Sequence, residues 1–186
     1  MAAPRDRNWV SDPHGRSVLI VGAGPIGILA VLAVRRAGAA RIIVTDIVEE
    51  PLEVARKVGA TDAVNVRTTE GPLPQVDVGL EMSGSPAGAA SCLNSVRRGG
   101  KVVLVRMPGG MTPTPLFLIV SREIDVYGSY RYVDEYAEAV EALGSSLDVA
   151  PVLSGSYSLD QDQAEEAFAR ADRKVAMKVQ LRFEPE

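Results

Sequence analysis

Cysteine and histidine are almost absent from this sequence of 186 residues, which contains one of each. Cys92 alone cannot form an internal disulfide bond, and Cys92 with His14 cannot complete a zinc site of the ordinary cysteine and histidine type. His14 lies in an irregular N-terminal segment, so a Ser/His catalytic pair would need that segment to fold back. Cys92 falls within a predicted helix and fits a small core residue better than a reactive thiol. The composition therefore predicts neither catalytic residues nor metal ligands here.

Long apolar runs and an excess of positive charge are missing too. The longest apolar run, residues 28–34, is too short to span a bilayer, and the first 15 residues lack the apolar core of a signal peptide. The net charge is −4 and the isoelectric point is about 5.2, so nothing electrostatic favours nucleic acid or an anionic membrane surface. We expect a cytoplasmic protein with neither nucleic acid nor membrane as a partner.

Short apolar runs alternate with longer helical stretches from Ser17 onward. With 46% hydrophobic residues, the chain can bury a sizeable core. The alternation is typical of an α/β fold in which a parallel sheet is covered on both faces. We predict strands at residues 18–21, 42–45, 63–66, 76–81, 102–105 and 124–128, and helices at 25–37, 50–58, 87–96, 116–121 and 133–143. The segment "RRGGK", residues 97–101, is interpreted as basic residues and glycine stops at the end of a helix.

The two ends of the chain differ from this pattern. Residues 1–16 show no periodicity and are interpreted as an arm or linker. Residues 17–150 are predicted to form the sheet domain, and residues 151–186 a tail. The tail should contain a strand, a helix that Asp160 caps and a last strand near 175–183. Because the tail is too small to have its own core, we expect it to dock on the sheet domain or on a part outside this sequence.

The segment "SVLIVGAGPIGILA" sets a glycine turn between a predicted strand and a predicted helix. Gly22 permits a tight turn, Gly24 lets the backbone approach a pyrophosphate, and Gly27 lets the helix pack closely on the strand. The N-terminus of the helix offers free N–H groups to phosphates. A tight turn without a ligand is the alternative. Asp46, 19 residues after Gly27, favours a dinucleotide because a carboxylate there can accept the adenosine ribose hydroxyls.

Asp46 also predicts which coenzyme the turn would hold. A carboxylate at this position repels a 2′-phosphate, and residues 47–50 contain no arginine that could bind that phosphate. The sequence therefore favours NAD over NADP.

Later segments supply further candidates at the same edge of the sheet. Ser83 and Gly84 follow the fourth predicted strand, where open α/β folds bind ligands, although a polar turn explains them as well. Arg106 follows the fifth strand and is either a receptor for phosphate or carboxylate or a surface charge. Beyond the sixth strand lies an aromatic cluster that could fill the core, form a stacking surface or contact a second subunit; it comprises Tyr127, Tyr130, Arg131, Tyr132 and Tyr136.

The motifs in series resemble one known family. "VLIVGAGPIGILAVLAVRRAGAARIIVTDIVEEPLEVARKVGATDAVNV", followed by "EMSG", "GGKVVLV" and "GSYRYVDEYAEAVEAL", is similar to the coenzyme-binding half of zinc-dependent medium-chain dehydrogenases, most of all sorbitol and other polyol dehydrogenases. The resemblance covers about residues 17–183. It implies a doubly wound Rossmann sheet of six parallel strands, NAD as the hydride carrier and the oxidation of a secondary alcohol or polyol to a ketone.

The resemblance also implies roles for individual residues. In this family the pyrophosphate lies against the residues that match Gly22, Gly24, Pro25, Ile26 and Gly27. Asp46 would bind the adenosine ribose, and the segment at Ser83 and Gly84 would run beside the coenzyme. Arg131 and Tyr132 match an Arg-Tyr pair near the nicotinamide and the substrate. The sixth strand would pair with its copy across a two-fold axis in a homodimer.

Two departures from the family pattern limit these implications. Arg106 stands where a glycine usually follows the fifth strand. The cysteine, histidine and glutamate ligands of the catalytic zinc belong to an N-terminal domain that this sequence does not resemble, and the family tail packs on that domain. The sequence thus predicts an NAD-binding half that is inactive alone. A module that senses NAD(H) without chemistry, or a structural protein that has lost the coenzyme, are the alternatives.

Overall fold

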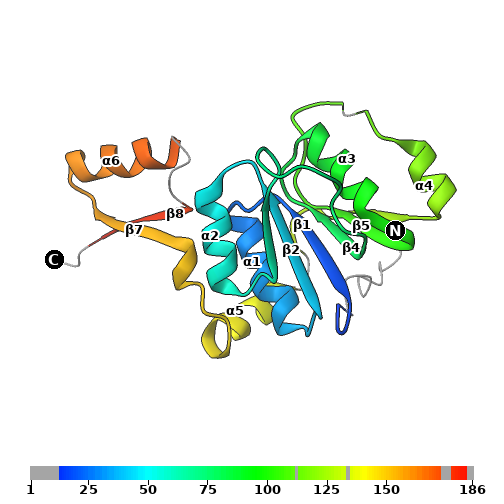
Figure 1. Ribbon diagram of the computed structural model, residues 1–186. Coiled ribbons are helices and arrows are strands. Elements are labelled where there is room, and N and C mark those ends of the chain that lie inside the picture. The colour runs from blue at the N-terminus through cyan, green and yellow to red at the C-terminus, as the bar shows by residue number, and fades with distance from the viewer. Residues whose placement is uncertain (1–12, 112, 133–134, 173–176, 184–186) are drawn as a thin grey trace, which may run out of the picture.

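The computed structural model describes residues 13–111, 113–132, 135–172 and 177–183. Strands and helices alternate along the chain as the sequence predicts, and the first six strands form one parallel sheet in the order β3-β2-β1-β4-β5-β6 (Figure 1). These strands are β1 (Ser17–Val21), β2 (Arg41–Asp46), β3 (Asp62–Asn65), β4 (Val76–Glu81), β5 (Val96–Leu104) and β6 (Asp125–Gly128). The helices between and after them are α1 (Pro25–Arg36), α2 (Glu49–Val58), α3 (Pro86–Ser95), α4 (Leu116–Arg122) and α5 (Glu135–Ser145).

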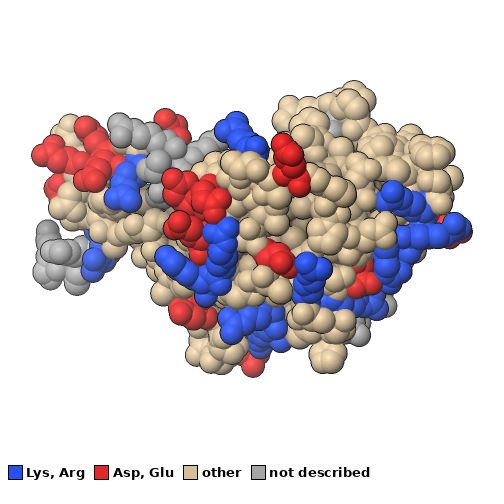
Figure 2. All heavy atoms as spheres, in the orientation of Figure 1, with Lys and Arg blue, Asp and Glu red and all other residues tan. Residues whose placement is uncertain are grey.

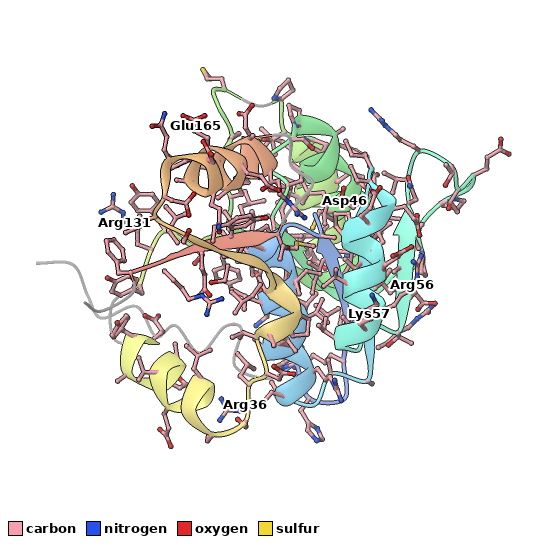
Figure 3. All side chains as sticks on the ribbon, turned by 90° about the vertical axis from the view of Figure 1, so that its left-hand side faces the viewer. Arg36, Asp46, Arg56, Lys57, Arg131 and Glu165 are labelled. Carbon is pink, nitrogen blue, oxygen red and sulfur yellow. The ribbon has the colours of Figure 1, made fainter. Side chains whose placement is uncertain are left out.

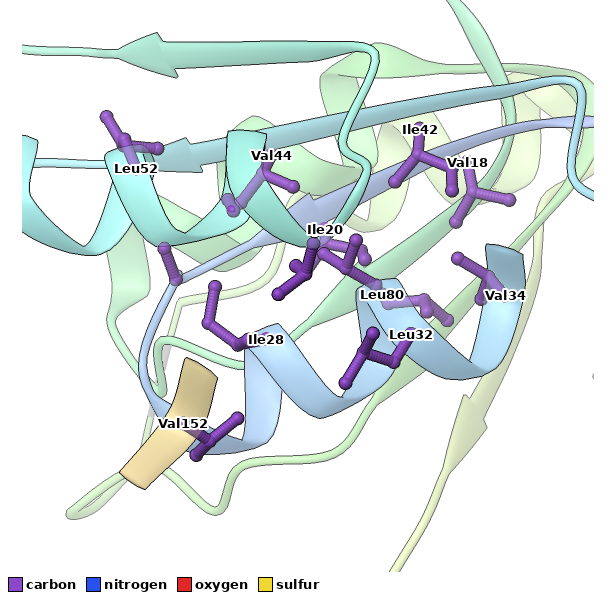
Figure 4. Close-up of a cluster of buried hydrophobic side chains, with 14 of the residues drawn as sticks. Val18, Ile20, Ile28, Leu32, Val34, Ile42, Val44, Leu52, Leu80 and Val152 are labelled. Atoms are coloured by element: carbon purple, nitrogen blue, oxygen red, sulfur yellow. The ribbon is translucent and has the colours of Figure 1, made fainter. Parts of the chain in front are cut away.

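Both faces of the sheet are covered, which explains why β1 is apolar from Val18 to Val21. Val18 and Ile20 pack against α1 and α2 (Figure 4). Leu19 and Val21 pack on the opposite side against α3. All four side chains are buried. Burial of an aliphatic side chain of this size contributes about 1.5–3 kcal/mol, so β1 stabilises the packing of helices on both faces.

The order of the strands places a topological switch point between β1 and β4. The chain runs outward from β1 to β2 and β3, and then returns across the sheet to β4. In sheets of this kind, ligands bind outside the carboxyl ends of the strands at the switch point. The return connection, residues 66–75, is the one crossover of this sheet without a helix, and with α3 it lines a cavity of about 400 Å³.

The prediction for residues 97–101 is wrong. Helix α3 ends at Ser95, and "RRGGK" belongs to β5 instead of a helix end. Val96 pairs with Val76 and Lys101 pairs with Val78, so residues 97–100 bulge out of the register of β5. The basic residues and glycines there have the composition of a helix end but form a bulge at the amino end of the sheet.

The tail contains the predicted elements. Strand β7 (Leu153–Ser158), helix α6 (Gln161–Asp172) and strand β8 (Lys178–Arg182) follow a short 3-10 helix, η2 (Ala150–Val152). The Asp160 carboxylate accepts the Gln163 N–H at 3.0 Å, which confirms Asp160 as a cap of α6.

Strands β7 and β8 are parallel and form a two-stranded sheet of their own, against which α6 packs. Figure 1 shows this unit beside the large sheet, and Figure 2 shows acidic side chains gathered over it. Val152 of η2 is buried among the side chains of α1 and α2, and this contact joins the tail to the sheet layer.

The start of the described chain packs against the body. The Gly15 N–H donates to the Gly38 carbonyl at 2.9 Å, and His14 forms an isolated antiparallel bridge with Ala39. Residues 1–12 of the predicted arm lie outside the described residues. No helix in the described part of the chain is long and apolar enough to cross a membrane.

Candidate nucleotide-binding site at the carboxyl edge of the sheet

The glycine turn lies at the switch point and has the geometry that its sequence predicts. Gly22 has a φ of 103°, and a Cβ there would lie 2.8 Å from the Ser83 backbone nitrogen. A Cβ on Gly27 would lie 1.9 Å from the Gly22 carbonyl oxygen. By contrast, a Cβ on Gly24 would meet no atom within 4 Å. The turn is therefore closed on its inner side and open on its outer side, where a ligand can approach the backbone.

Helix α1 begins directly at this opening. Gly24 is its N-cap residue, Pro25 is its first residue, and the Ile28 N–H donates to the Gly24 carbonyl at 2.9 Å. The N–H groups of Ile26 and Gly27 belong to the first turn, where no intrahelical acceptor exists. The Ile26 side chain is 57% exposed. The opening thus offers backbone donors and a positive helix end to an anionic group, and the apolar Ile26 side chain lies beside them.

Asp46 connects the end of β2 to the glycine turn. One carboxylate oxygen accepts the Ala23 N–H at 2.7 Å, and the other accepts the N–H groups of Ile47 at 2.7 Å and Val48 at 3.1 Å. The carboxylate is thereby fixed beside the turn while part of it stays open to solvent. Ile47 and Val48 next to it are exposed apolar residues. Figure 3 shows Asp46 at the end of its strand beside α2.

Glu81 is a residue of this edge that the sequence analysis did not select. Its side chain is buried at the end of β4, and one oxygen accepts the Ser83 N–H at 2.9 Å and the Ser83 hydroxyl at 2.5 Å. The Gly84 N–H donates to both carboxylate oxygens, at 3.1 and 3.2 Å. Glu81 therefore holds the loop after β4 in place beside the turn. A carboxylate that ends an apolar strand just before "MSGS" was the available signal.

Arg106 follows β5 at the same edge and lies against this loop. Its backbone N–H points to the Glu81 carbonyl at 3.4 Å. A Cβ on Gly84, whose φ is 68°, would lie 2.9 Å from both Cγ and Cδ of Arg106. The structure therefore brings together the glycine turn, Asp46, the loop with Ser83 and Gly84, and Arg106.

Arg131 and Tyr132 are placed differently. They follow β6, two strands beyond β4, and both are exposed. The Arg131 guanidinium lies 5.0 Å from the centre of the Tyr130 ring, and the rings of Tyr132 and Tyr136 are 5.7 Å apart. Figure 3 shows Arg131 well apart from Asp46. Tyr130, Tyr132 and Tyr136 are each at least 64% exposed, so these three rings of the aromatic cluster lie at the surface, whereas Tyr127 is half-buried.

The groups described at this edge include hydrogen-bond donors and acceptors that a ligand can contact. Within the described ranges, no group of three or more histidine, cysteine, aspartate or glutamate side chains could hold a metal ion. Burial raises the pKa of the Cys92 thiol to about 12, with a smaller contribution from the nearby Glu81 charge. The open outer side at Gly24, the helix N-terminus and the fixed Asp46 carboxylate together fit a nucleotide that has a pyrophosphate and a free ribose.

Comparison with known proteins identifies the family. A family model described as zinc-binding dehydrogenase matches residues 25–145, more than half of the chain. The chain belongs to the zinc-binding dehydrogenase family. A sorbitol dehydrogenase of Bacillus subtilis is 39% identical over 168 residues, which cover 84% of this chain and 47% of that protein. An L-idonate 5-dehydrogenase of Escherichia coli matches 92% of this chain and 51% of its own, with a TM-score of 0.84 and 33% identity.

The family resemblance and the α/β fold predicted from the motifs are thus confirmed, and the chain spans about half the length of the relatives that it matches. Two further structures contain a coenzyme. An Escherichia coli CFT073 dehydrogenase with NADH has a TM-score of 0.82 at 19% identity, covering 93% of this chain and 54% of its own. A Sinorhizobium meliloti 1021 zinc-binding dehydrogenase with NADP has a TM-score of 0.77 at 25% identity, covering 90% and 52%.

Proposed function

We propose that this chain is the NAD(H)-binding half of a zinc-dependent alcohol or polyol dehydrogenase. The observation that carries the proposal is the hydrogen bond from the Ala23 N–H to Asp46, because it joins a pyrophosphate-binding turn to a ribose-binding carboxylate. The open space at Gly24 would receive the pyrophosphate, and the Asp46 carboxylate would accept the hydroxyl groups of the adenosine ribose. The exposed side chains of Ile47 and Val48 would lie beside the adenine.

The proposed contribution of this chain is to hold and orient the coenzyme. When bound, NAD supplies the acceptor for a hydride from a secondary alcohol. The first turn of α1 would fix the phosphates, and the loop held by Glu81 would support the middle of the coenzyme. The nicotinamide half of the coenzyme would then extend toward β5 and β6. Arg131 and Tyr132 follow β6. The described residues offer no set of zinc ligands, so no zinc-dependent step is assigned to them.

We propose NAD and not NADP as the coenzyme. The Asp46 carboxylate would repel a 2′-phosphate on the ribose that it binds, and the next four residues contain no basic side chain. Dehydrogenases of this fold bind either coenzyme, so the choice depends on residues of this kind.

Calorimetric titration of the chain with NADH and with NADPH tests both proposals. We expect NADH to bind at least tenfold more tightly than NADPH, and Asp46→Asn to reduce that ratio because the substitution removes the repelling charge. Circular dichroism establishes that each sample is folded. A folded chain that binds neither nucleotide would contradict the proposed function, whereas equal binding of the two would contradict only the preference for NAD.

We also propose partner surfaces for a complete enzyme. Residues 151–186 would form a unit that packs on the catalytic domain, since Phe168 and Phe183 on it are exposed. Strand β6, at the edge of the sheet, would pair with its copy in a homodimer because Val126 on it and Phe117 on the adjacent α4 are exposed apolar residues. Sedimentation of the wild type and of Val126→Lys tests the dimer: we expect a dimer and a monomer respectively, and a wild-type monomer at high concentration would contradict it.

A further inference from the structure

The glycine turn lacks a positive side chain for the group that it would hold. Residues 22–29 contain no lysine, arginine or hydrogen-bonding side chain, and Pro25 lacks an N–H. Two carboxylates, Asp46 and Glu81, lie at the same edge of the sheet. A pyrophosphate adds two negative charges to this surface, and the helix end offsets only about half an elementary charge. A cation from another element would therefore strengthen the binding of a pyrophosphate at this turn.

Arg106 is placed to provide that cation. Its Cγ and Cδ lie against Gly84, and the neighbouring Ser83 lies against Gly22 of the turn. A continuous line of contacts thus leads from the glycine turn through the β4 loop to the stem of Arg106. The arginine is exposed, and among the described residues its guanidinium has no hydrogen-bond or ion-pair partner. The packing thus places the stem of Arg106, while its guanidinium stays available to an anion.

We propose that Arg106 binds the pyrophosphate of the coenzyme from the β5 side, opposite the backbone donors of α1. A guanidinium can donate two parallel hydrogen bonds to phosphate oxygens, which a glycine at this position could not do. Arg131 is less suited because its guanidinium lies over the Tyr130 ring, beyond β6. This inference rests on the proposed function, since it assigns a charge partner to the same coenzyme.

Titration of Arg106→Gln with NAD, NADH, ADP-ribose and adenosine tests the proposal. A hydrogen-bonded ion pair with phosphate predicts that the affinity for NAD, NADH and ADP-ribose falls by a common factor of about ten, while that for adenosine is unchanged. Arg106→Lys should restore part of the loss, because the charge returns without the two-pronged geometry. Arg36→Gln is the matched control: it removes the same charge at the far end of α1, as Figure 3 shows, and should leave every affinity unchanged.

The possible outcomes separate the inference from the function that it assumes. A folded wild type that binds neither NAD nor ADP-ribose overturns the proposed function. If the wild type binds both and Arg106→Gln binds them equally well, Arg106 is not a phosphate ligand. A loss for NAD but not for ADP-ribose places Arg106 at the nicotinamide half and overturns the assignment. Tighter binding of NAD by Arg106→Gly, which removes the side chain, shows that the arginine obstructs the coenzyme.

Discussion

Substitution of Asp77 by asparagine is expected to destabilise the sheet in a pH-dependent manner. Asp77 on β4 accepts the backbone N–H of Ser17 at 2.8 Å, the Ser17 hydroxyl at 2.7 Å and the Arg97 Nε–H at 2.6 Å. These donors, first among them the Ser17 backbone, lower the pKa of Asp77 from 3.8 to about 2. The bonds join β1, β4 and β5 at the amino end of the sheet.

The size of the effect follows from the lowered pKa. A change from 3.8 to about 2 corresponds to roughly 2.4 kcal/mol. Because 25% of the side chain is exposed, we reduce the expected contribution to about 1–2 kcal/mol. The pKa is lower in the folded state, so the contribution is complete above about pH 5 and is lost as the pH falls through 3.8 toward 2. At pH 3 about half of it remains.

Urea denaturation followed by far-UV circular dichroism at pH 7 and pH 3 measures this dependence. Asp77→Asn should lower the free energy of unfolding by about 1–2 kcal/mol at pH 7 and by about half as much at pH 3. Asp62→Asn is the matched control, since Asp62 lies in an exposed ion pair with Arg41, which is expected to contribute less than about 1 kcal/mol. An equal loss at both pH values, or no loss at pH 7, would refute the argument.

Alanine at two glycines of the turn should affect two different properties, stability at Gly27 and coenzyme affinity at Gly24. Gly27→Ala would place a Cβ 1.9 Å from the Gly22 carbonyl, so we expect a fall in stability of about 1–3 kcal/mol that thermal unfolding detects. At Gly24 a Cβ meets no protein atom, so Gly24→Ala should keep its stability but bind NADH at least tenfold more weakly in calorimetry, because the methyl group occupies the approach of the phosphate. Unchanged NADH affinity of Gly24→Ala would contradict the placement of the pyrophosphate.

Much of the sheet layer could be predicted because its signals are local. The run from Val76 to Glu81 was predicted with its bounds correct, since apolar residues stand between breaks on both sides. The beginning of β5 could not be predicted. Whether Arg97 ends a helix or bulges from a strand depends on its ion pair with Asp77, 20 residues away, and no local pattern reports that contact.

In the candidate site, too, some residues could be predicted from the sequence and others could not. Gly22, Gly24 and Asp46 could be chosen from spacing because the geometry of a strand, turn and helix fixes what each position needs. Glu81 could not be chosen in this way. Its role depends on which backbone N–H groups of the following loop turn back toward it, and that is visible only once the loop is folded. The packing of Arg106 against Gly84 likewise depends on tertiary contacts that the local sequence does not report.

The tail has a consequence for how the molecule opens. Its sheet has two strands and therefore two unpaired edges, with α6 packed against both strands. A pair of strands of this kind is only marginally stable in water, whereas β1 is enclosed between two strands and two layers of helices. Local unfolding should begin in the tail, and its amide hydrogens should exchange long before those of β1. A protein surface that binds over Phe168 and Phe183 would slow the amide exchange of the tail, so this exchange would report the binding.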